Sequence, residues 1–366
     1  MKFIHCADIH LDSAFTLSNP AEAGRRRNEL RAAFSSLVLY ARSEGCSLFF
    51  ISGDLFDDKT VTKDTFEMLE REMSSLPSCH FFISPGNHDP YSDKSPYTYV
   101  NFPENVHLFT SSDMQYFDIP ELSVRVYGYA FTSDTKKKSP LEGFTVENKE
   151  LINVLVCHGE FGNPISNYCP ILEADMEKSG FDYIALGHIH KGTGLKYAGK
   201  VPYAYPGCVS GRGFDETGDK GAFIGEISKG SVSLSAVRLS SRKYEITSCD
   251  ITGASSVSDA AEKIMSACSS FGDNTALRLI LEGVTYPEFS YSDDEIRRLV
   301  QKPFYLEVKD NTLPLYNVDY LRKDNTVIGE FYRNIEPILV SDDLKERETA
   351  RLALKYGLKA LYGREI

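Results

Sequence analysis

The sequence lacks any apolar run long enough to cross a membrane. Its longest apolar stretches, such as VLVC at residues 154–157, have only the length of a β-strand, whereas a membrane-spanning helix needs about 18 or more apolar residues in succession. The N-terminus, MKFIHCADIH, also lacks the apolar run of a signal peptide. We therefore expect a soluble, cytoplasmic protein with no membrane partner.

The sequence has no CxxC pair, although it contains eight cysteines. Scattered cysteines in a chain without a secretion signal are more often free thiols than disulfides. Several of these cysteines fall within apolar, strand-like segments, where the side chain packs as a small core residue. We therefore expect free thiols rather than a disulfide framework.

The sequence is also short of positive charge. It has 40 Lys and Arg against 52 Asp and Glu, for a formal net charge of −12. Proteins that hold nucleic acid over most of their surface are usually basic, so the charge argues against a general polyanion-binding surface. It does not exclude a local site, because carboxylates gathered around metal ions count as negative here and are neutralised when the metals bind.

The length and composition of the sequence are those of an ordinary globular protein. Its 366 residues, 42% hydrophobic and 25% charged, are long for one domain and suit two. Apolar runs at residues 2–6, 47–52 and 79–84 predict strands, and apolar residues spaced by three and four predict helices over 20–46 and 62–76. Strand–helix alternation of this kind indicates a parallel sheet with helices packed on it.

The pattern changes after residue 105. Short strand candidates then follow one another with few helices between them, which favours a layered sandwich of two sheets over a single doubly wound sheet. The segment LSSRKY near residues 239–244 interrupts the pattern, and we place a domain boundary between residues 240 and 241. Residues 241–366 then read as a small α/β domain ending in a helix over 342–362.

Five short polar stretches each follow an apolar strand candidate. They are ADIH (7–10), GDLFD (53–57), GNHD (86–89), CHGE (157–160) and GHIH (187–190). Ligands of open α/β sheets bind at the carboxyl ends of the strands, so we expect these stretches to converge. We also expect each DxH or HxH pair to be extended, with both side chains on one face, and the glycines at 53, 86 and 187 to allow tight turns before the ligands.

The stretches supply a mixed nitrogen and oxygen ligand set that requires no thiolate. Its members are Asp8, His10, Asp54, Asn87, His158, His188 and His190. Such a set suits Mn, Fe or Zn better than Ca. Seven ligands are too many for one tetrahedral site and fit two ions sharing a carboxylate, an arrangement that clamps a phosphate ester and generates a hydroxide nucleophile. A single GD, GH or HxH is commonplace, so the inference rests on the whole set in this order.

These residues resemble the pattern of the calcineurin-like metallophosphoesterase superfamily: DxH, GDxxD, GNH(D/E), H and GHxH. All five blocks fall between residues 1 and about 240. Within the superfamily the chain looks most like the SbcD-type and YhaO-type DNA repair exonucleases. The features that favour this branch are KFIHCADIHLDSAF, SGDLFDDK and YPGCVSGRGFDETGDKGAF. The resemblance implies a four-layer α/β/β/α metallophosphoesterase (nuclease) domain over 1–240 and, by size and position, a capping-like domain over 241–366.

The resemblance also implies a role for each residue. Asp8, His10 and His190 would hold one metal ion, Asn87, His158 and His188 the other, and Asp54 would bridge the two. A bridging hydroxide would attack phosphorus in line, while His88 would assist the leaving group as an acid or phosphate-orienting group. Asp89 would orient His88. Asp57 closes the GDxxD block at a position where some nucleases of this group carry His, so a role there in positioning DNA is open.

Further contacts with substrate are less specific in the sequence. Ser210 and Arg212, in the loop after GHIH, are candidates for phosphate contact, although an ordinary surface loop explains them equally well. The basic runs available for a DNA backbone are Arg25–Arg27 and Lys136–Lys138, and such runs are usually solvated surface.

The leading hypothesis is a Mn-dependent DNA exonuclease or endonuclease in DNA repair, working with an SbcC-like coiled-coil ATPase. A small-molecule phosphodiesterase or a protein phosphatase of the same superfamily is the alternative, and the acidic net charge supports it. A third hypothesis is a non-catalytic scaffold that has kept the fold. The intact ligand set and His88 argue against it, because a scaffold needs neither. A homodimer through the helices at 20–46 or 62–76 is a further expectation.

Overall fold

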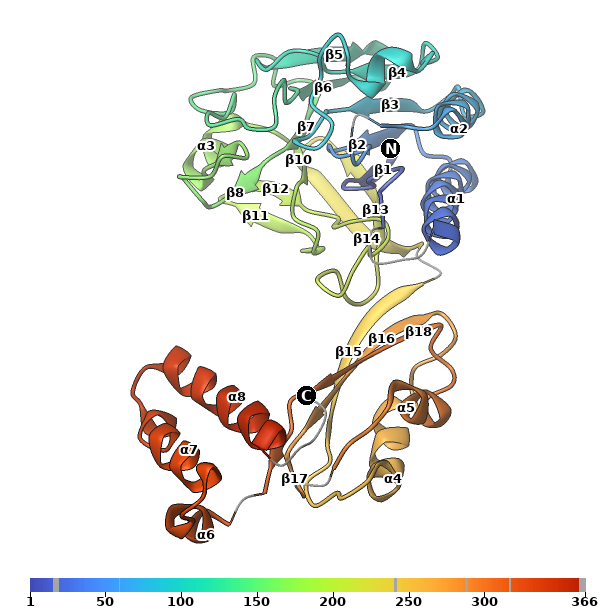
Figure 1. The fold of residues 1–366 in the computed structure, drawn as a ribbon. Helices are drawn as coiled ribbons and strands as arrows, with labels where there is room; N and C mark the ends of the chain where they lie inside the picture. Colours follow the sequence, from blue (N-terminus) through green and yellow to red (C-terminus); the bar gives the residue numbers. More distant parts are fainter. Residues whose placement is uncertain (16–19, 59, 240–241, 287–288, 316, 362–366) are drawn as a thin grey trace. The chain divides into compact units, whose positions relative to one another are not determined.

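The computed structural model describes residues 1–15, 20–58, 60–239, 242–286, 289–315 and 317–361. Two compact units are present, Met1–Lys243 and Tyr244–Ile366 (Figure 1). The division falls close to the boundary expected between residues 240 and 241. Among the described residues, no helix is long and apolar enough to cross a membrane.

The first sheet of the N-terminal unit has six strands in the order β14-β13-β1-β2-β3-β4. The bounds are β1 Lys2–Cys6, β2 Leu48–Ile51, β3 His80–Ile83, β4 Val106–Leu108, β13 Gly221–Ser228 and β14 Ser231–Arg238. Strands β1 to β4 are parallel, and β13 and β14 add an antiparallel edge. The segments LFFI and HFFI are almost continuously buried, as is typical of parallel strands covered on both faces.

The second sheet also has six strands, in the order β11-β12-β10-β7-β6-β5. The bounds are β5 Gln115–Ile119, β6 Val124–Gly128, β7 Ile152–His158, β10 Tyr183–Gly187, β11 Lys196–Ala198 and β12 Val201–Ala204. The four central strands are parallel, and the edge strands β5 and β11 pair antiparallel.

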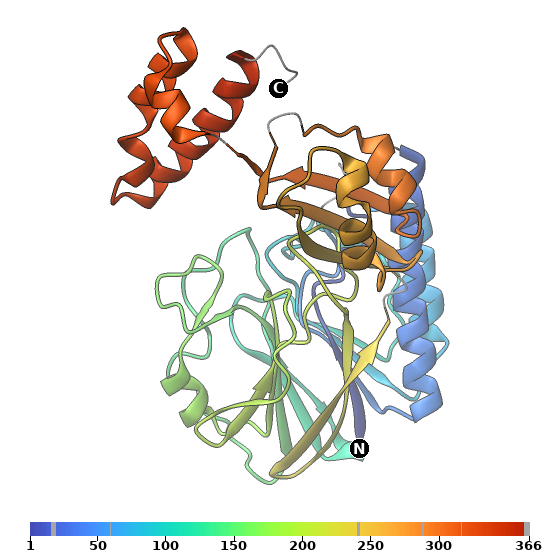
Figure 2. The same cartoon turned by 90° about the horizontal axis from the view of Figure 1, so that it is seen from below.

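The two sheets pack face to face, and helices cover their outer faces. Phe3, Phe50 and Phe82 of the first sheet meet Val126, Val154 and Tyr183 of the second in one buried cluster. Helices α1 (Pro20–Glu44) and α2 (Lys63–Ser74) lie on the other face of the first sheet, and α3 (Glu173–Ser179) lies beside the second (Figure 2). The predicted four-layer α/β/β/α sandwich is therefore confirmed, although the layer over the second sheet contains a single seven-residue helix and several loops.

The short elements of this unit lie in its connections. They are the strands β8 (Glu160–Phe161) and β9 (Pro170–Ile171) and the 3₁₀ turns η1 (Pro96–Tyr99) and η2 (Pro120–Leu122). All eight cysteines of the chain are free and buried, as expected from their apolar surroundings in the sequence.

The C-terminal unit begins with a small α/β layer. Its sheet has the order β15-β16-β18. The bounds are β15 Lys243–Asp250, β16 Thr275–Glu282, β18 Tyr305–Asp310, α4 Val257–Cys268 and α5 Asp293–Leu299, with a short pair β17 Val284–Thr285 and β19 Leu313–Pro314. Both helices begin at a capping box, at Ser256 and Ser292, which satisfies amide groups left unpaired in the first turn.

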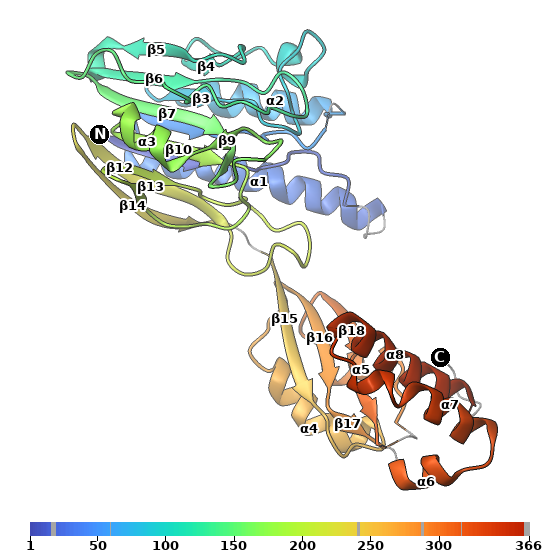
Figure 3. The ribbon, with the colours of Figure 1, turned by 90° about the vertical axis from the view of Figure 1, so that its left-hand side faces the viewer.

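Three helices complete this unit and form a separate small core. They are α6 (Val318–Lys323), α7 (Val327–Ile335) and α8 (Leu344–Leu361), with the turn η3 (Ile338–Val340) between the last two. Figure 3 shows α7 beside α8, and Leu321, Tyr332, Leu354 and Leu358 form their buried cluster. The sequence indicated α8, whereas α6 and α7 were not predicted. Helix α6 has only six residues. Helix α7 does carry Ile328, Phe331, Tyr332 and Ile335 at helical spacing, so its signal was present and was missed.

Candidate metal centre

The five polar stretches converge where parallel strands of both sheets end. Asp8 follows β1, Asp54 follows β2 and Asn87 follows β3, while His158 is the last residue of β7 and His188 follows β10. Neighbouring parallel strands carry their carboxyl ends to the same edge, so the loops after them meet there.

The backbone at these ligands differs from the expected extended conformation. Asp8, His10 and Asp54 have φ values of 50°, 51° and 50°, and His188 has a φ of 108°, all in a region that non-glycine residues rarely adopt. Hydrogen bonds between the loops stabilise this backbone conformation. The Asp8 amide donates to Gly53 O at 3.1 Å, and the His10 amide donates to Asp54 O at 3.0 Å. The expectation of side chains alternating along a strand was therefore wrong here, because β1 and β10 end before the ligands begin. Left-handed turns concentrate at functional sites.

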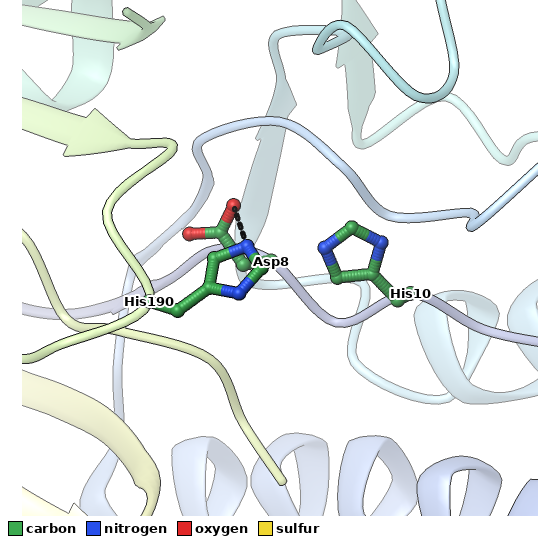
Figure 4. Close-up of side chains that lie close together, drawn as sticks. All are labelled: Asp8, His10 and His190. Atoms are coloured by element: carbon green, nitrogen blue, oxygen red, sulfur yellow. Dashed lines mark ion pairs between the residues drawn. The ribbon is translucent and has the colours of Figure 1, made fainter. Parts of the chain in front are cut away.

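The first ligand group is Asp8, His10 and His190, and one donor atom of each lies within 4.8 Å of the others. Figure 4 shows Asp8 and His10 on one stretch of chain and His190 on another, with a dashed line from Asp8 to His190. Asp8 Oδ1 lies 3.6 Å from His190 Nε2. His10 is completely buried, and within the described part of the chain its Nε2 has no hydrogen-bond partner. A buried nitrogen with a lone pair and no donor is costly unless a cation occupies the position.

The second group is Asn87, His158 and His188. The side-chain oxygen of Asn87 lies 2.9 Å from His158 Nε2 and 3.2 Å from His188 Nδ1. On its other side the His158 ring places Nδ1 3.0 Å from the carbonyl oxygen of Ser52. A proton on that Nδ1 leaves Nε2 as the atom that faces Asn87, which is the orientation a metal ligand requires.

Asp54 lies between the two groups. Its Oδ2 is 3.5 Å from His158 Nε2 and 3.8 Å from His10 Nε2, and its Oδ1 accepts a hydrogen bond of 3.0 Å from the backbone amide of His88. One carboxylate thus faces a histidine from each group, as a bridging ligand does.

The buried carboxylates have opposite pKa shifts. Burial raises the pKa of Asp8, and the attraction of His158 offsets this only in part. Burial also opposes ionisation of Asp54, but His158 and His10 outweigh it and hold the pKa of Asp54 below its usual value. Asp54 is therefore readily ionised. Ionisation of Asp8 costs free energy unless a cation lies beside it.

Two histidines of the centre also have opposite pKa shifts. Burial and then the neighbouring His158 lower the pKa of His188 to about 4, which keeps the ring neutral and able to act as a ligand. Burial lowers the pKa of His190 as well, but the hydrogen bond from its Nδ1 to Glu216, at 2.7 Å, raises it above the usual value.

This arrangement fits divalent metal ions. It combines two buried carboxylates, an amide oxygen, neutral imidazoles and the unpartnered His10 Nε2, and such oxygen and nitrogen donors suit Mn, Fe or Zn. The groups Asp8–Asp54–His158 and Asp8–His10–His190 both bring ligand atoms within 4.8 Å of one another. The donors fit two neighbouring ions with Asp54 between them.

Comparison with known proteins agrees with this geometry. A family model described as calcineurin-like phosphoesterase matches residues 1–192. The chain belongs to the calcineurin-like phosphoesterase family. The superfamily resemblance expected from the five motifs is thereby confirmed, and membership implies a hydrolase of phosphate esters that binds divalent metals.

Individual relatives extend the match beyond the family model. The uncharacterized metallophosphoesterase YhaO of Bacillus subtilis (strain 168) is 29% identical over 303 residues, which are 79% of this chain and 73% of that protein. The DNA double-strand break repair protein Mre11 of Methanopyrus kandleri is 21% identical over 281 residues, 67% of this chain and 61% of that protein. The crystal structure of TT1561 of Thermus thermophilus aligns with 65% of this chain and 99% of its own, with a TM-score of 0.39 and 10% identity.

In this phosphoesterase, His88 is exposed beside the centre rather than within it. Its ring centroid lies 4.9 Å from that of His10, and its Nδ1 is 3.2 Å from the carbonyl oxygen of Asp57. The side chain therefore reaches solvent next to the ligands.

Asp89 has a different role from the one expected. Its Oδ1 accepts from the Gly86 amide at 2.7 Å, and its Oδ2 accepts from the Phe56 amide at 3.0 Å and from the Tyr97 hydroxyl. Within the described residues it makes no hydrogen bond to the His88 ring. The predicted orientation of His88 by Asp89 was wrong, because both carboxylate oxygens are used to join the loops after β2 and β3.

Glu216 is a part of the centre that the sequence analysis did not identify. It is buried and hydrogen-bonded to His190, while its Oε1 also lies 3.0 Å from Arg212. Arg212 in turn donates to Asp57 Oδ1 at 2.7 Å, and the same oxygen lies 2.9 Å from His10 Nδ1. One guanidinium thus connects the carboxylates that support His10 and His190. The sequence feature that could have indicated this role is the segment GRGFDETGDK, which contains both Arg212 and Glu216. It suggested only contact with substrate.

The expected phosphate contacts of Ser210 and Arg212 receive no support from the structure. Ser210 is buried, and the guanidinium of Arg212 is occupied by Asp57 and Glu216. In the basic run Arg25–Arg27, Arg26 is buried and donates to the carbonyl oxygen of Gly211, whereas Arg25 is exposed.

Proposed function

We propose that this chain is a two-metal phosphodiester hydrolase that acts on DNA, with Mn²⁺ in both sites. The observation that carries the proposal is Asp54, which faces a histidine of each ligand group while an exposed imidazole, His88, lies at the rim. Divalent ions held here would activate water and polarise a phosphate ester.

The protein groups divide the work around the reacting phosphate. Asp8, His10 and His190 would hold one ion, Asn87, His158 and His188 would hold the other, and Asp54 would contribute to both sites. His88 Nδ1 lies 3.2 Å from the carbonyl oxygen of Asp57 and is the donor in that contact. When the ring is doubly protonated, Nε2 would carry the proton given to the leaving oxygen. The backbone amide of His88 donates to Asp54 Oδ1, which fixes the backbone that carries the imidazole next to the bridging carboxylate.

DNA is proposed as the substrate because the chain is similar to a protein named for repair of DNA double-strand breaks. The similarity to YhaO, over 79% of this chain, supports the phosphoesterase activity alone. The net charge of −12 keeps a small-molecule phosphodiesterase or phosphatase as the second candidate. The ligands are imidazoles, carboxylates and an amide oxygen without a thiolate, which fit Mn, Fe or Zn, and Mn²⁺ is the ion that we propose to test first.

An SbcC-like coiled-coil ATPase is proposed as the protein partner, with the C-terminal unit as its docking region. The helices α6–α8 and the turn η3 leave several large apolar side chains exposed, namely Tyr320, Val327, Val340, Leu344 and Leu352. Exposed apolar patches of this kind are typical of surfaces that bind other proteins. The capping role of this unit and a homodimer through α1 or α2 belong to the same proposal.

The experiment offers the purified protein, with Mn²⁺, linear DNA, a cyclic nucleotide and bis(p-nitrophenyl) phosphate. We expect Mn-dependent cleavage of DNA, abolished in Asp54→Asn. Hydrolysis of only the small esters, with intact DNA even when the ATPase is added, would contradict the nuclease proposal and favour the second candidate.

A further inference from the structure

The loop between β8 and β9 is rigidly closed beside the metal centre. Glu160, two residues after the ligand His158, accepts hydrogen bonds from Ser166 Oγ and from Asn163 Nδ2, the latter at 3.2 Å. Its backbone amide donates to the carbonyl oxygen of Tyr168 at 2.9 Å. The ends of the loop are thus held together, and the side chains at its surface keep a defined position relative to the ligands.

Tyr168 lies at the end of this loop against a ligand of the second group. Its ring centroid is 4.9 Å from that of His188, the two planes are inclined by 36°, and the residue is 38% exposed. Its amide donates to Ser166 Oγ at 2.9 Å, which fixes the backbone that carries the ring. Ile165 of the same loop is 89% exposed. An aromatic ring and an apolar side chain therefore face solvent next to the centre.

The lysine run 136–138 lies alongside the same loop. Lys136 and Tyr168 form a parallel bridge, the Lys136 amide donates to Asn167 O at 2.7 Å, and the Cys169 amide donates to Lys136 O at 2.6 Å. The ammonium of Lys136 is occupied, because it donates to Ser112 O at 2.6 Å and lies 5.3 Å from the Tyr129 ring centroid. Lys137 and Lys138 are exposed.

We infer that Tyr168, with Lys137 and Lys138 beside it, forms a subsite for a single strand of DNA that leads to the metal centre. This inference rests on the proposed function and specifies how its substrate is recognised. A base of the strand stacks on the Tyr168 ring next to the scissile phosphate, and neighbouring phosphates contact the two lysines.

The chemistry of single-strand binding favours this occupant. Proteins that bind single strands without sequence preference combine aromatic rings, on which bases stack, with cations that follow the backbone. Here both features occur on two paired segments, one of which also contacts a ligand through Tyr168. A cyclic nucleotide has a base to stack on Tyr168 but no further phosphates to reach the lysines, so only a polynucleotide uses both features. The local pair of cations also accounts for binding of a polyanion by a chain of net negative charge.

The test compares a short single-stranded oligonucleotide with the same oligonucleotide made abasic around the cleaved position, both with Mn²⁺. Loss of one stacked base weakens binding by roughly 5- to 100-fold. We expect Tyr168→Ala to raise KM for the intact strand by a factor in this range and to leave KM for the abasic strand unchanged. Tyr168→Phe should behave as wild type, and Tyr197→Ala, an exposed tyrosine on the edge strand β11, is the matched control.

The lysines are tested by the salt dependence of KM. Replacing both Lys137 and Lys138 by Ala should lower the slope of log KM against log salt by about 0.7 for each lost phosphate contact. Replacing the exposed Lys149 and Lys200 should leave the slope unchanged. DNA cleavage by wild type with equal effects of Tyr168→Ala on the intact and abasic strands would overturn the subsite alone. Failure of wild type to bind or cleave any DNA would overturn it together with the nuclease proposal.

Discussion

At the scale of single residues, His88 and Asn87 are neighbours with separate tasks. Asn87 faces His158 and His188 from inside the centre, whereas His88 is exposed at its rim. We expect His88→Ala to lower kcat by about 10²- to 10⁴-fold, as loss of a general acid does, and to retain two bound metal ions. Asn87→Ala should lose activity and also weaken metal binding. Kinetics with DNA combined with elemental analysis distinguishes the two, and full activity of His88→Ala would show that its assigned role is wrong.

Arg212 provides a second prediction at this scale. Because its guanidinium connects Asp57 beside His10 with Glu216 beside His190, its loss releases two ligands of the same ion. Removal of such supporting groups typically lowers metal affinity about 10- to 100-fold. Calorimetric titration of metal-free Arg212→Ala with Mn²⁺ should show one weakened site and one unchanged site.

Two further variants make the Arg212 prediction specific. Arg212→Lys should restore little, since an ammonium does not span two carboxylates as a guanidinium does. The control is Arg125→Ala, which breaks a comparable pair with Asp118 on the edge strand β5 and should leave both sites intact. Equal weakening of both sites in Arg212→Ala would contradict a role confined to the first group.

Many residues of the centre could be predicted from the sequence, because the type of a residue determines whether its side chain can bind a metal ion. Carboxylates and histidines placed after apolar strands are visible in one sequence. The partners of these ligands are harder to recognise. Glu216 contacts His190 from a separate loop, and its segment GRGFDETGDK suggested only contact with substrate. Asp89 shows the converse case, where adjacency to His88 in the chain did not mean contact in space.

At the scale of elements, the loops after β2, β3 and β10 approach so closely that their glycines leave no room for a side chain. A Cβ on Gly86 would lie 2.1 Å from Asp54 Oδ1, and one on Gly187 would lie 1.7 Å from the Ser52 carbonyl oxygen. The main role of the glycines before the ligands is thus to let neighbouring loops lie close together. The sequence predicted only their role in tight turns.

Gly86→Ala tests this close approach. The added methyl group must displace the bridging Asp54, so we expect both metal sites to weaken and activity to fall at least about 10-fold while the fold persists. Gly24→Ala is the matched control. Its Cβ meets nothing within 4 Å on α1, and the change should stabilise the protein by about 0.5–1 kcal/mol. Metal titration and thermal unfolding of both variants provide the measurement, and normal Mn²⁺ binding by Gly86→Ala would refute the crowding argument.

The helices show where prediction from one sequence ends. The long helix α1 was visible because Leu30, Phe34, Leu37 and Ala41 recur on its buried face. The short α3 buries Met176 and Ser179 alone and has no such repeat. Short helices are held by tertiary packing rather than by their own pattern, so their existence depends on neighbours distant in sequence.

At the scale of the whole molecule, every residue of the metal centre belongs to the N-terminal unit, Met1–Lys243. This unit has its own buried clusters, and the C-terminal unit has separate ones. We expect a fragment of residues 1–243 to fold, to bind two Mn²⁺ and to hydrolyse bis(p-nitrophenyl) phosphate at close to the rate of the full chain. Circular dichroism and metal analysis check it, and an unfolded or metal-free fragment would show that the C-terminal unit is needed to build the centre.

The central claim is that two ions occupy one centre and share Asp54, and the most direct measurement is anomalous diffraction from crystals grown with Mn²⁺. We predict two peaks, one among Asp8, His10 and His190 and the other among Asn87, His158 and His188, separated by about 3.5–4 Å, with Asp54 ligating both. A single peak, or two peaks of which only one contacts Asp54, would contradict the account.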